Sequence, residues 1–147
     1  MSPHTLEILR AATALMGLTA LMWAWMLVVR LRAMARAGIS PQDAAHVADL
    51  GPRLPSAVRR VADNHNHLFE APTVFYAAMA VLALLDAATA TEAGAAWAFV
   101  LLRVSHSLVQ ATVNRVSVRF TLFVLSWIAL LVLIGSAAWA VFVAAPS

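Results

Sequence analysis

The sequence predicts an all-α integral membrane protein in which four transmembrane helices form one bundle. Three observations support this fold class. The 147 residues are 63% hydrophobic and 12% charged, whereas a soluble domain carries roughly a quarter charged residues. Two long runs have no charged residue, and the arginines gather beside the hydrophobic runs. We therefore expect residues 1–147 to form a single membrane domain.

The first and fourth predicted spans are free of charge in their centres. Crossing the hydrocarbon core takes about 20 apolar helical residues. Residues 11–29 contain no charge and predict a span over about 7–30. The arginines follow this run instead of preceding it, which argues against a cleavable signal peptide. Residues 120–147 are also uncharged and predict a span over about 120–143.

The two middle spans must include polar residues. The apolar run 71–85 alone would cover only about 22 Å as a helix, so the second span is predicted over about 62–85 and takes in His67 and Glu70. The third span, over about 93–113, takes in Arg103 and His106. Ionisable groups at membrane depth usually face the bundle interior and mark functional sites.

The connecting segments contain several helix signals. A cytoplasmic loop is expected over 31–60. Within it, Ser40 followed by proline and an acidic residue predicts a short capped helix that ends near Gly51. Ser56 is a candidate cap for the second span. Pro72 is expected to kink that span, because it cannot donate a hydrogen bond to the carbonyl of Leu68.

The arginines predict the orientation of the bundle. Two of the three loops are rich in arginine and the second loop has none. By the positive-inside rule, both arginine-rich loops face the cytoplasm and both termini lie outside. The arginines of these two loops are Arg30, Arg32, Arg36, Arg53, Arg59, Arg60, Arg115 and Arg119.

Composition also excludes several functions. The chain has no cysteine, which excludes a disulfide scaffold, a thiolate metal site and a cysteine nucleophile. A metal site would have to combine His67, Glu70 and His106, which lack a signature spacing, so no metal is expected. The basic residues flank apolar runs, so no nucleic acid is expected as a partner. A transporter is also disfavoured, because the sequence shows no inverted repeat of the kind that many transporters have.

Two polar stripes are predicted at helical spacing. In the second span Arg60, Asn64 and His67 lie on one face, and in the third span Arg103 and Gln110 share a face. Asn114 and Ser117 are expected to continue the third-span face, with His106 at its edge. For Asn64, Gln110 and Asn114 taken singly, a role only in holding helices together is an equal alternative.

Depth suggests that two charges form a pair. Glu70 lies about 12 Å and Arg103 about 15 Å from the expected cytoplasmic boundary. We therefore predict a buried ion pair between them. The result is a polar cleft that opens to the cytoplasm. Because arginines bind carboxylates and phosphates through forked donors, a small anionic ligand is expected there, together with a hydrophobic partner from the bilayer.

These residues resemble the motifs of a known family. Residues 60–76 read RVADNHNHLFEAPTVFY, which resembles the second-helix motif of the MAPEG family, the membrane-associated proteins in eicosanoid and glutathione metabolism. Residues 96–107 read AWAFVLLRVSHS, and with Asn114, Arg115 and Arg119 they resemble the third-helix pattern of its bacterial branch. The number of spans and the arginine-rich first loop also agree.

The resemblance implies a homotrimer in a bacterial inner membrane, with glutathione bound as cosubstrate between subunits near the cytoplasmic side. It implies a glutathione-dependent transferase or peroxidase that acts on lipophilic electrophiles or hydroperoxides in the membrane. The catalytic residues would be Arg103 and Arg119. The glutathione-binding residues would be Arg30 (or Arg32), Arg60, Asn64, His67, Glu70, His106 and Gln110.

The chain departs from the family pattern at four positions. His67 stands where the family has asparagine, Asn64 where it has alanine, Arg59 where it has glutamate, and Gln110 where the transferases often have tyrosine. The alternative function is therefore a non-catalytic membrane protein that binds a lipid or small amphiphile in the same inter-subunit cleft.

Overall fold

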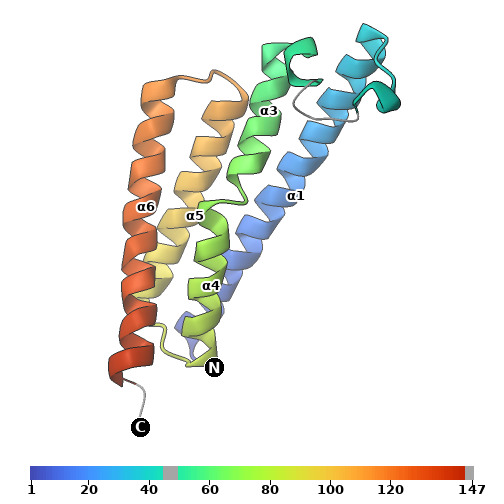
Figure 1. Ribbon diagram of the computed structural model, residues 1–147. Helices are drawn as coiled ribbons and strands as arrows, with labels where there is room; N and C mark the ends of the chain where they lie inside the picture. Colours follow the sequence, from blue (N-terminus) through green and yellow to red (C-terminus); the bar gives the residue numbers. More distant parts are fainter. Residues whose placement is uncertain (45–49, 145–147) are drawn as a thin grey trace.

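The computed structural model describes residues 1–44 and 50–144, and every regular element in these ranges is a helix (Figure 1). Four helical rods run side by side as a bundle, and the second rod is interrupted. The elements are α1 (Pro3–Ala37), the 3₁₀ turns η1 (Pro41–Ala44) and η2 (Gly51–Arg53), α3 (Ser56–His67), α4 (Ala71–Leu84), α5 (Ala90–Ala111), α6 (Val116–Trp139) and the π-helical η3 (Ala140–Ala144).

Helix α1 is longer than the predicted span. The side chain of Ser2 accepts a hydrogen bond from the Thr5 amide at its start, and Gly38 ends it in the left-handed region at φ 63°. Its 35 residues cover about 52 Å, which is more than the hydrocarbon core requires. The predicted loop over 31–60 begins too early, because Arg32 and Arg36 lie on the helix itself.

The second rod is broken, not simply kinked. Helix α3 ends at His67 and α4 begins at Ala71, so the prediction of one bent helix over 62–85 is wrong between these residues. Proline has no amide hydrogen to donate, and its ring collides with the carbonyl four residues earlier, here that of Leu68, so an unbroken helix cannot run through Pro72. Glu70, two residues before Pro72, has φ −94° and ψ −100°, outside the helical region.

Two cap predictions need correction. Ser56 is the first residue of α3 instead of its cap, which is Pro55. Ser40 and Asp43 do bond each other as a cap would, Asp43 accepting from the Ser40 amide at 2.9 Å, but the turn they start is the short 3₁₀ turn η1. The rest of the predicted short helix, 45–49, lies outside the described residues.

Three helical stretches are long and apolar enough to cross a membrane: Pro3–Ala37, Ser56–Leu84 and Val116–Ala144. Helix α5 has 22 residues and packs between α1 and α6, but its polar residues keep it out of that set. Length and composition thus identify three of the four predicted spans in the described ranges, and α5 completes the bundle by its position.

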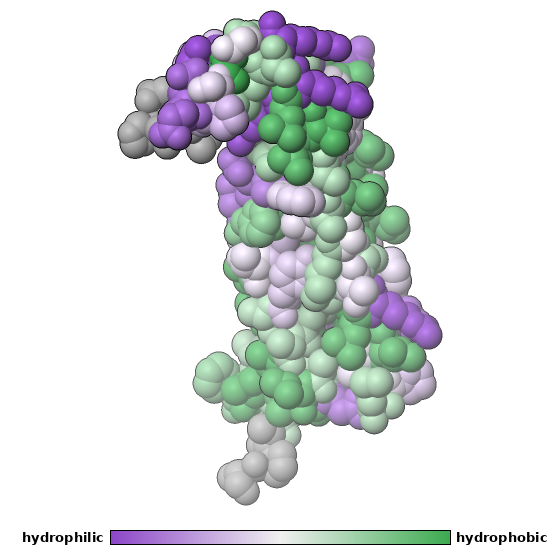
Figure 2. Space-filling model, turned by 90° about the vertical axis from the view of Figure 1, so that its right-hand side faces the viewer, coloured by the Kyte–Doolittle hydropathy of each residue, from purple (hydrophilic) through white to green (hydrophobic). Residues whose placement is uncertain are grey.

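The two ends of the bundle differ in chemistry. Both termini lie at one end, which we call the terminal end, and the loops rich in arginine lie at the other, which we call the arginine-rich end (Figure 1). Figure 2 shows hydrophilic side chains concentrated at the arginine-rich end and mostly apolar or weakly polar surface below it. Large apolar side chains such as Leu84, Leu101 and Phe142 are exposed. Such a surface suits a protein whose solvent is lipid.

The apolar core lies toward the terminal end. The rings of Phe75 in α4 and Phe99 in α5 stack with centroids 4.6 Å apart. Leu15 of α1 and Leu130 and Leu133 of α6 are completely buried in the same cluster. This core fixes α4, α5 and α6 relative to α1, and it leaves the polar residues of α3 and α5 to the other half of the bundle.

Candidate functional site

The break between α3 and α4 is bridged by a side chain from α5. Residues 68–70 cannot continue the helix, so the carbonyl of His67 lacks its normal helical partner. The guanidinium of Arg103 donates a hydrogen bond to this carbonyl over 2.6 Å. Arg103 is 1% exposed, so one of the most expensive groups to place inside a membrane is held against the point where the second rod is interrupted.

Around Arg103 lies a group of buried polar side chains, which we call the buried polar cluster. Asn64 comes from α3, and the other members come from α5, which packs against α3. All are nearly or completely inaccessible. The members are Asn64, Arg103, His106, Ser107 and Gln110.

Many atoms of the buried polar cluster have no hydrogen-bond partner among the described residues. Buried polar atoms are normally paired, because leaving one unpaired costs about 1–3 kcal/mol. The unpaired set includes donors and acceptors, so it can bind a ligand or water that offers both. The atoms are Nδ2 and Oδ1 of Asn64, Nε and Nη1 of Arg103, Nδ1 of His106, Oγ of Ser107 and Oε1 of Gln110.

The predicted ion pair between Glu70 and Arg103 is wrong. Glu70 instead pairs with His67, whose Nδ1 lies 3.0 Å from its Oε2, and both side chains are substantially exposed. The depth argument placed the two charges at a similar level, but the break turns Glu70 outward while Arg103 stays inside. The His67 ring also meets the ring of His106 edge-on at 6.3 Å, so the exposed pair adjoins the buried polar cluster.

The alternative metal site lacks the required geometry. Within residues 1–44 and 50–144, no three histidine or carboxylate side chains come together in a way that could hold a metal ion. His67 is therefore hydrogen-bonded to Glu70 and meets His106 edge-on, without a metal-binding arrangement of the three in this structure.

The first-helix arginine that faces α3 is Arg30. A hollow of about 180 Å³ lies between α1 and α3 and is lined by Arg30, Arg59, Asp63 and Asn66, among others. The Nε atoms of Arg30 and Arg60 are both buried, and neither has a hydrogen-bond partner within the described ranges. Arg32 lines a different groove. Sequence reasoning left Arg30 and Arg32 open, and the structure places only Arg30 beside the polar side of α3.

Arg119 lies apart from the buried polar cluster in its bonding. Its Nη1 donates to Oδ1 of Asn114 over 2.7 Å, across the turn between α5 and α6. Helix α5 ends at Ala111, and Asn114 has φ 51° in the turn. The prediction that Asn114 and Ser117 continue the α5 face is therefore wrong, because both residues lie beyond the end of that helix.

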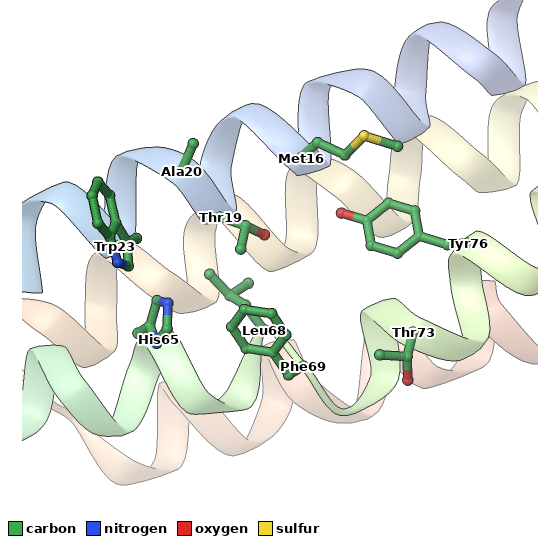
Figure 3. A pocket seen from close by; sticks show the side chains of 9 residues that line it. All are labelled: Met16, Thr19, Ala20, Trp23, His65, Leu68, Phe69, Thr73 and Tyr76. Atoms are coloured by element: carbon green, nitrogen blue, oxygen red, sulfur yellow. The ribbon is translucent and has the colours of Figure 1, made fainter.

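An apolar groove opens beside the break on the side facing α1 (Figure 3). Its volume is about 540 Å³. Figure 3 shows Phe69 and Leu68 projecting from the interrupted segment, while the hydroxyl of Tyr76 points from α4 toward Thr19 on α1. The remaining lining comes from Met16, Ala20, Trp23, His65 and Thr73.

Sequence reasoning missed three features of this region. It missed the size of the break, although Pro72 was a usable signal because proline restricts the residue before it. It missed Ser107, which follows Arg103 at helical spacing on α5 and is 1% exposed. It also missed the apolar groove. The walls of this groove come from separate helices, and the sequence of one helix gives no signal that such a groove exists.

Comparison with known proteins gives one match. The family model described as "MAPEG family" matches residues 8–139. No curated protein and no solved structure matches the chain.

Proposed function

The chain belongs to the MAPEG family, and we propose that it is a glutathione-dependent transferase or peroxidase acting on lipophilic molecules dissolved in the membrane. The observation that carries this proposal is the buried polar cluster with its unpaired atoms. A membrane protein stabilised only by packing would have no reason to bury an arginine with two of its three guanidinium nitrogens unpaired, beside two amides that also have unpaired atoms. We further propose a homotrimer in a bacterial inner membrane, with the arginine-rich end in the cytoplasm and the termini outside.

The unpaired atoms fit glutathione in chemical type. The tripeptide carries two carboxylates, an ammonium group and two amides. Arg30 and Arg60 offer buried guanidinium nitrogens to the carboxylates, and Asp63 lines the same hollow as Arg30 and can accept from the ammonium group. The hollow of about 180 Å³ accommodates one end of the ligand, and the exposed His67–Glu70 pair lies further along the same rod.

When bound, glutathione would supply the thiol that attacks the electrophile or reduces the hydroperoxide. The protein's part is to favour the thiolate form. Arg103 carries a permanent positive charge, and its burial removes the water that would screen it, so its field is stronger than that of a surface arginine. Arg119 adds a second positive charge at the arginine-rich end, held by Asn114. In this proposal the hydrogen-bonded His67–Glu70 pair would accept the thiol proton.

The apolar groove supports the alternative of a non-catalytic binding protein. Its volume of about 540 Å³ and its lining by Met16, Trp23, Leu68 and Phe69 suit an acyl chain or a small amphiphile. In the enzyme the same groove would hold the lipophilic acceptor. The two functions therefore share one apolar site and differ in whether the buried polar cluster binds a thiol.

The test uses the purified full chain in detergent with glutathione, S-methylglutathione, a chlorinated nitroaromatic and an organic hydroperoxide. The enzyme proposal expects thermal stabilisation by glutathione and by S-methylglutathione, whose sulfur is capped, and turnover of an acceptor only with glutathione. Arg60→Ala and Arg103→Gln should abolish the stabilisation, whereas the exposed Arg115→Ala should keep it. Stabilisation without turnover of either acceptor would favour the binding protein, and the absence of both effects would contradict the glutathione proposal.

A further inference from the structure

A groove carrying three arginines lies at the arginine-rich end, between the last turns of α1 and the start of α3. We call it the arginine groove. It is lined by Arg32 and Arg36 of α1 and by Arg53 of η2, and its volume is about 560 Å³. Arg32 and Arg36 are four residues apart on one helix, so their side chains lie on the same side of it. It is separate from the hollow that contains Arg30.

The arginines of this groove keep their charges available. All three are exposed, and none forms an ion pair within residues 1–44 and 50–144. Among the described carboxylates, that of Asp43 feels the charge of Arg53. The pKa of Asp43 is held below the ordinary value first by hydrogen bonds from Ser40 and to a smaller extent by this charge. Asp43 does not line the groove, so the described lining carries three guanidinium groups and no carboxylate.

The arginine groove also has an apolar lining, which we call its floor. It includes Val29 and Ala33 of α1 and Val58 of α3. An inorganic anion would leave this floor uncovered. A ligand that joins an anionic group to a hydrocarbon chain would use both parts of the lining.

The position of the groove along α1 matches the lipid headgroup layer. The charge-free run of α1 ends at Val29, and the groove extends from Val29 to Ala37, about 12 Å along the helix axis. The bilayer adds about 5–8 Å of headgroup region on each side of its hydrocarbon core. The backbone of Arg32 lies about 4–5 Å beyond Val29, within this headgroup layer, and that of Arg36 about 10 Å beyond Val29, from where its long side chain can reach back to the phosphates. The apolar floor begins at the level of the acyl chains.

We propose that the arginine groove is a binding site for one anionic phospholipid. Its phosphodiester would accept forked hydrogen bonds from Arg36 and Arg53, and the start of an acyl chain would cover Val29 and Val58. Basic pockets at membrane boundaries recognise such headgroups, and guanidinium forks match phosphate geometry better than isolated point charges do. A zwitterionic lipid would bring its cationic headgroup against three arginines and bind less well.

The experiment measures lipid retention by native mass spectrometry, and thermal stabilisation, for the full chain in detergent without glutathione. The additives are phosphatidylglycerol, phosphatidylcholine and inorganic phosphate. We expect one phosphatidylglycerol per chain to be retained and to raise the melting temperature. Arg36→Gln/Arg53→Gln should weaken its binding roughly 30-fold, which is about 2 kcal/mol and corresponds to two arginines near an anionic surface.

The matched control is Arg10→Gln/Arg115→Gln, which removes the same charge from exposed positions outside the groove. It should keep phosphatidylglycerol binding within about threefold of the unchanged chain, a difference of under 1 kcal/mol. Equal losses in the two double variants would overturn the proposal, because the effect would then be one of net charge. Equal retention of phosphatidylcholine, or full stabilisation by inorganic phosphate, would also overturn it. Since glutathione is absent, these outcomes are independent of the proposed enzymatic function.

Discussion

Two of the buried ionisable side chains on helix α5, Glu92 and Arg103, have surroundings that are opposite in kind. In its first turn, Glu92 is 8% exposed, and its carboxylate accepts hydrogen bonds from the amide and hydroxyl of Thr89 and from the hydroxyl of Ser136 on α6. About 16 Å further along the helix, Arg103 is 1% exposed and has one described partner, the carbonyl of His67.

This difference extends to the halves of the bundle in which they lie. Toward the terminal end, most polar groups are paired: Asp86 accepts from the Ser2 amide and the Thr5 hydroxyl, and Trp97 donates to Glu7. The exception is Nε1 of Trp127, which packs against the apolar core and is buried without a described partner. Toward the arginine-rich end, seven atoms of the buried polar cluster are unpaired within the described ranges. A paired buried group stabilises the fold, whereas a set of unpaired ones lowers stability and is retained where a ligand needs it.

The largest expected effect comes from removing the unpaired charge. Arg103→Met replaces the guanidinium with an apolar side chain of similar length. We expect glutathione-dependent turnover to fall at least 100-fold, because the loss of an electrostatic contact to a developing anion typically costs about 2.7–4 kcal/mol. The melting temperature should hold or rise, since replacing a buried charge with a packed apolar group is often neutral or stabilising.

The matched control for Arg103→Met is Arg115→Met, which removes an exposed arginine outside the proposed site. Its turnover should stay near that of the unchanged chain. Steady-state kinetics and thermal unfolding would be measured on the same preparations. A large drop in melting temperature with unchanged activity per folded chain would assign Arg103 to the architecture instead of the site.

The second prediction removes the paired charge. Glu92→Val leaves the amide and hydroxyl of Thr89 and the hydroxyl of Ser136 without their acceptor. We expect a loss of about 2–3 kcal/mol in the free energy of unfolding, with activity per folded chain unchanged. Ser136→Ala breaks only one of these bonds and should cost about 1 kcal/mol. If Glu92→Val abolished turnover in folded protein, the division between an architectural and a functional half would be wrong.

Much of the fold could be predicted because it depends on local sequence. Charge-free runs predicted α1 and α6. The apolar runs of the middle spans are too short to cross the bilayer alone, which predicted that polar residues of α3, α4 and α5 lie at membrane depth. The family could also be predicted, because its motif is contiguous over residues 60–76 and the family match spans 8–139. The length of α1 was missed because arginines continue a helix as readily as they form a loop.

The geometry of the site could be predicted only in part. Helical spacing correctly placed Arg103, His106 and Gln110 inside the bundle. The depth argument failed for Glu70, because counting residues along the axis assumes an unbroken helix and the rod is interrupted just before Pro72. Spacing also gives no information about pairing across helices, so it could not show that Arg103 reaches the His67 carbonyl. That contact exists only because the break exposes the carbonyl to α5.

A third prediction addresses the cost of the unpaired atoms directly. Gln110→Met removes an amide whose Oε1 is buried without a described partner. We expect the free energy of unfolding to rise by about 1 kcal/mol and glutathione to bind about fivefold more weakly, the change that corresponds to losing about 1 kcal/mol of contact. Thermal unfolding without glutathione gives the change in the free energy of unfolding, and the same measurement with glutathione gives the change in its affinity. A loss of stability would mean that Gln110 is paired in the native membrane and belongs to the architecture.

The smallest effect concerns acid stability at the terminal end. Hydrogen bonds from the Ser2 amide and then the Thr5 hydroxyl lower the pKa of Asp86 from 3.8 to about 2. Because the folded state binds this proton less readily than the unfolded state, the stabilisation is complete above the unfolded pKa and is lost as the pH falls toward the folded one. The window is therefore about pH 4 to pH 2.

Asp86→Asn is the test, since asparagine tolerates the φ of 48° at this position. Its melting temperature should lie below that of the unchanged chain at pH 6, and the two should converge between pH 4 and pH 2. Taking the difference between the two proteins cancels the titration of the other carboxylates. Turnover at pH 7 should be equal, because Asp86 is at the opposite end of the bundle from the buried polar cluster. A difference in melting temperature that stays constant down to pH 2 would show that the Asp86 charge does not hold the N-terminus against the α4–α5 turn.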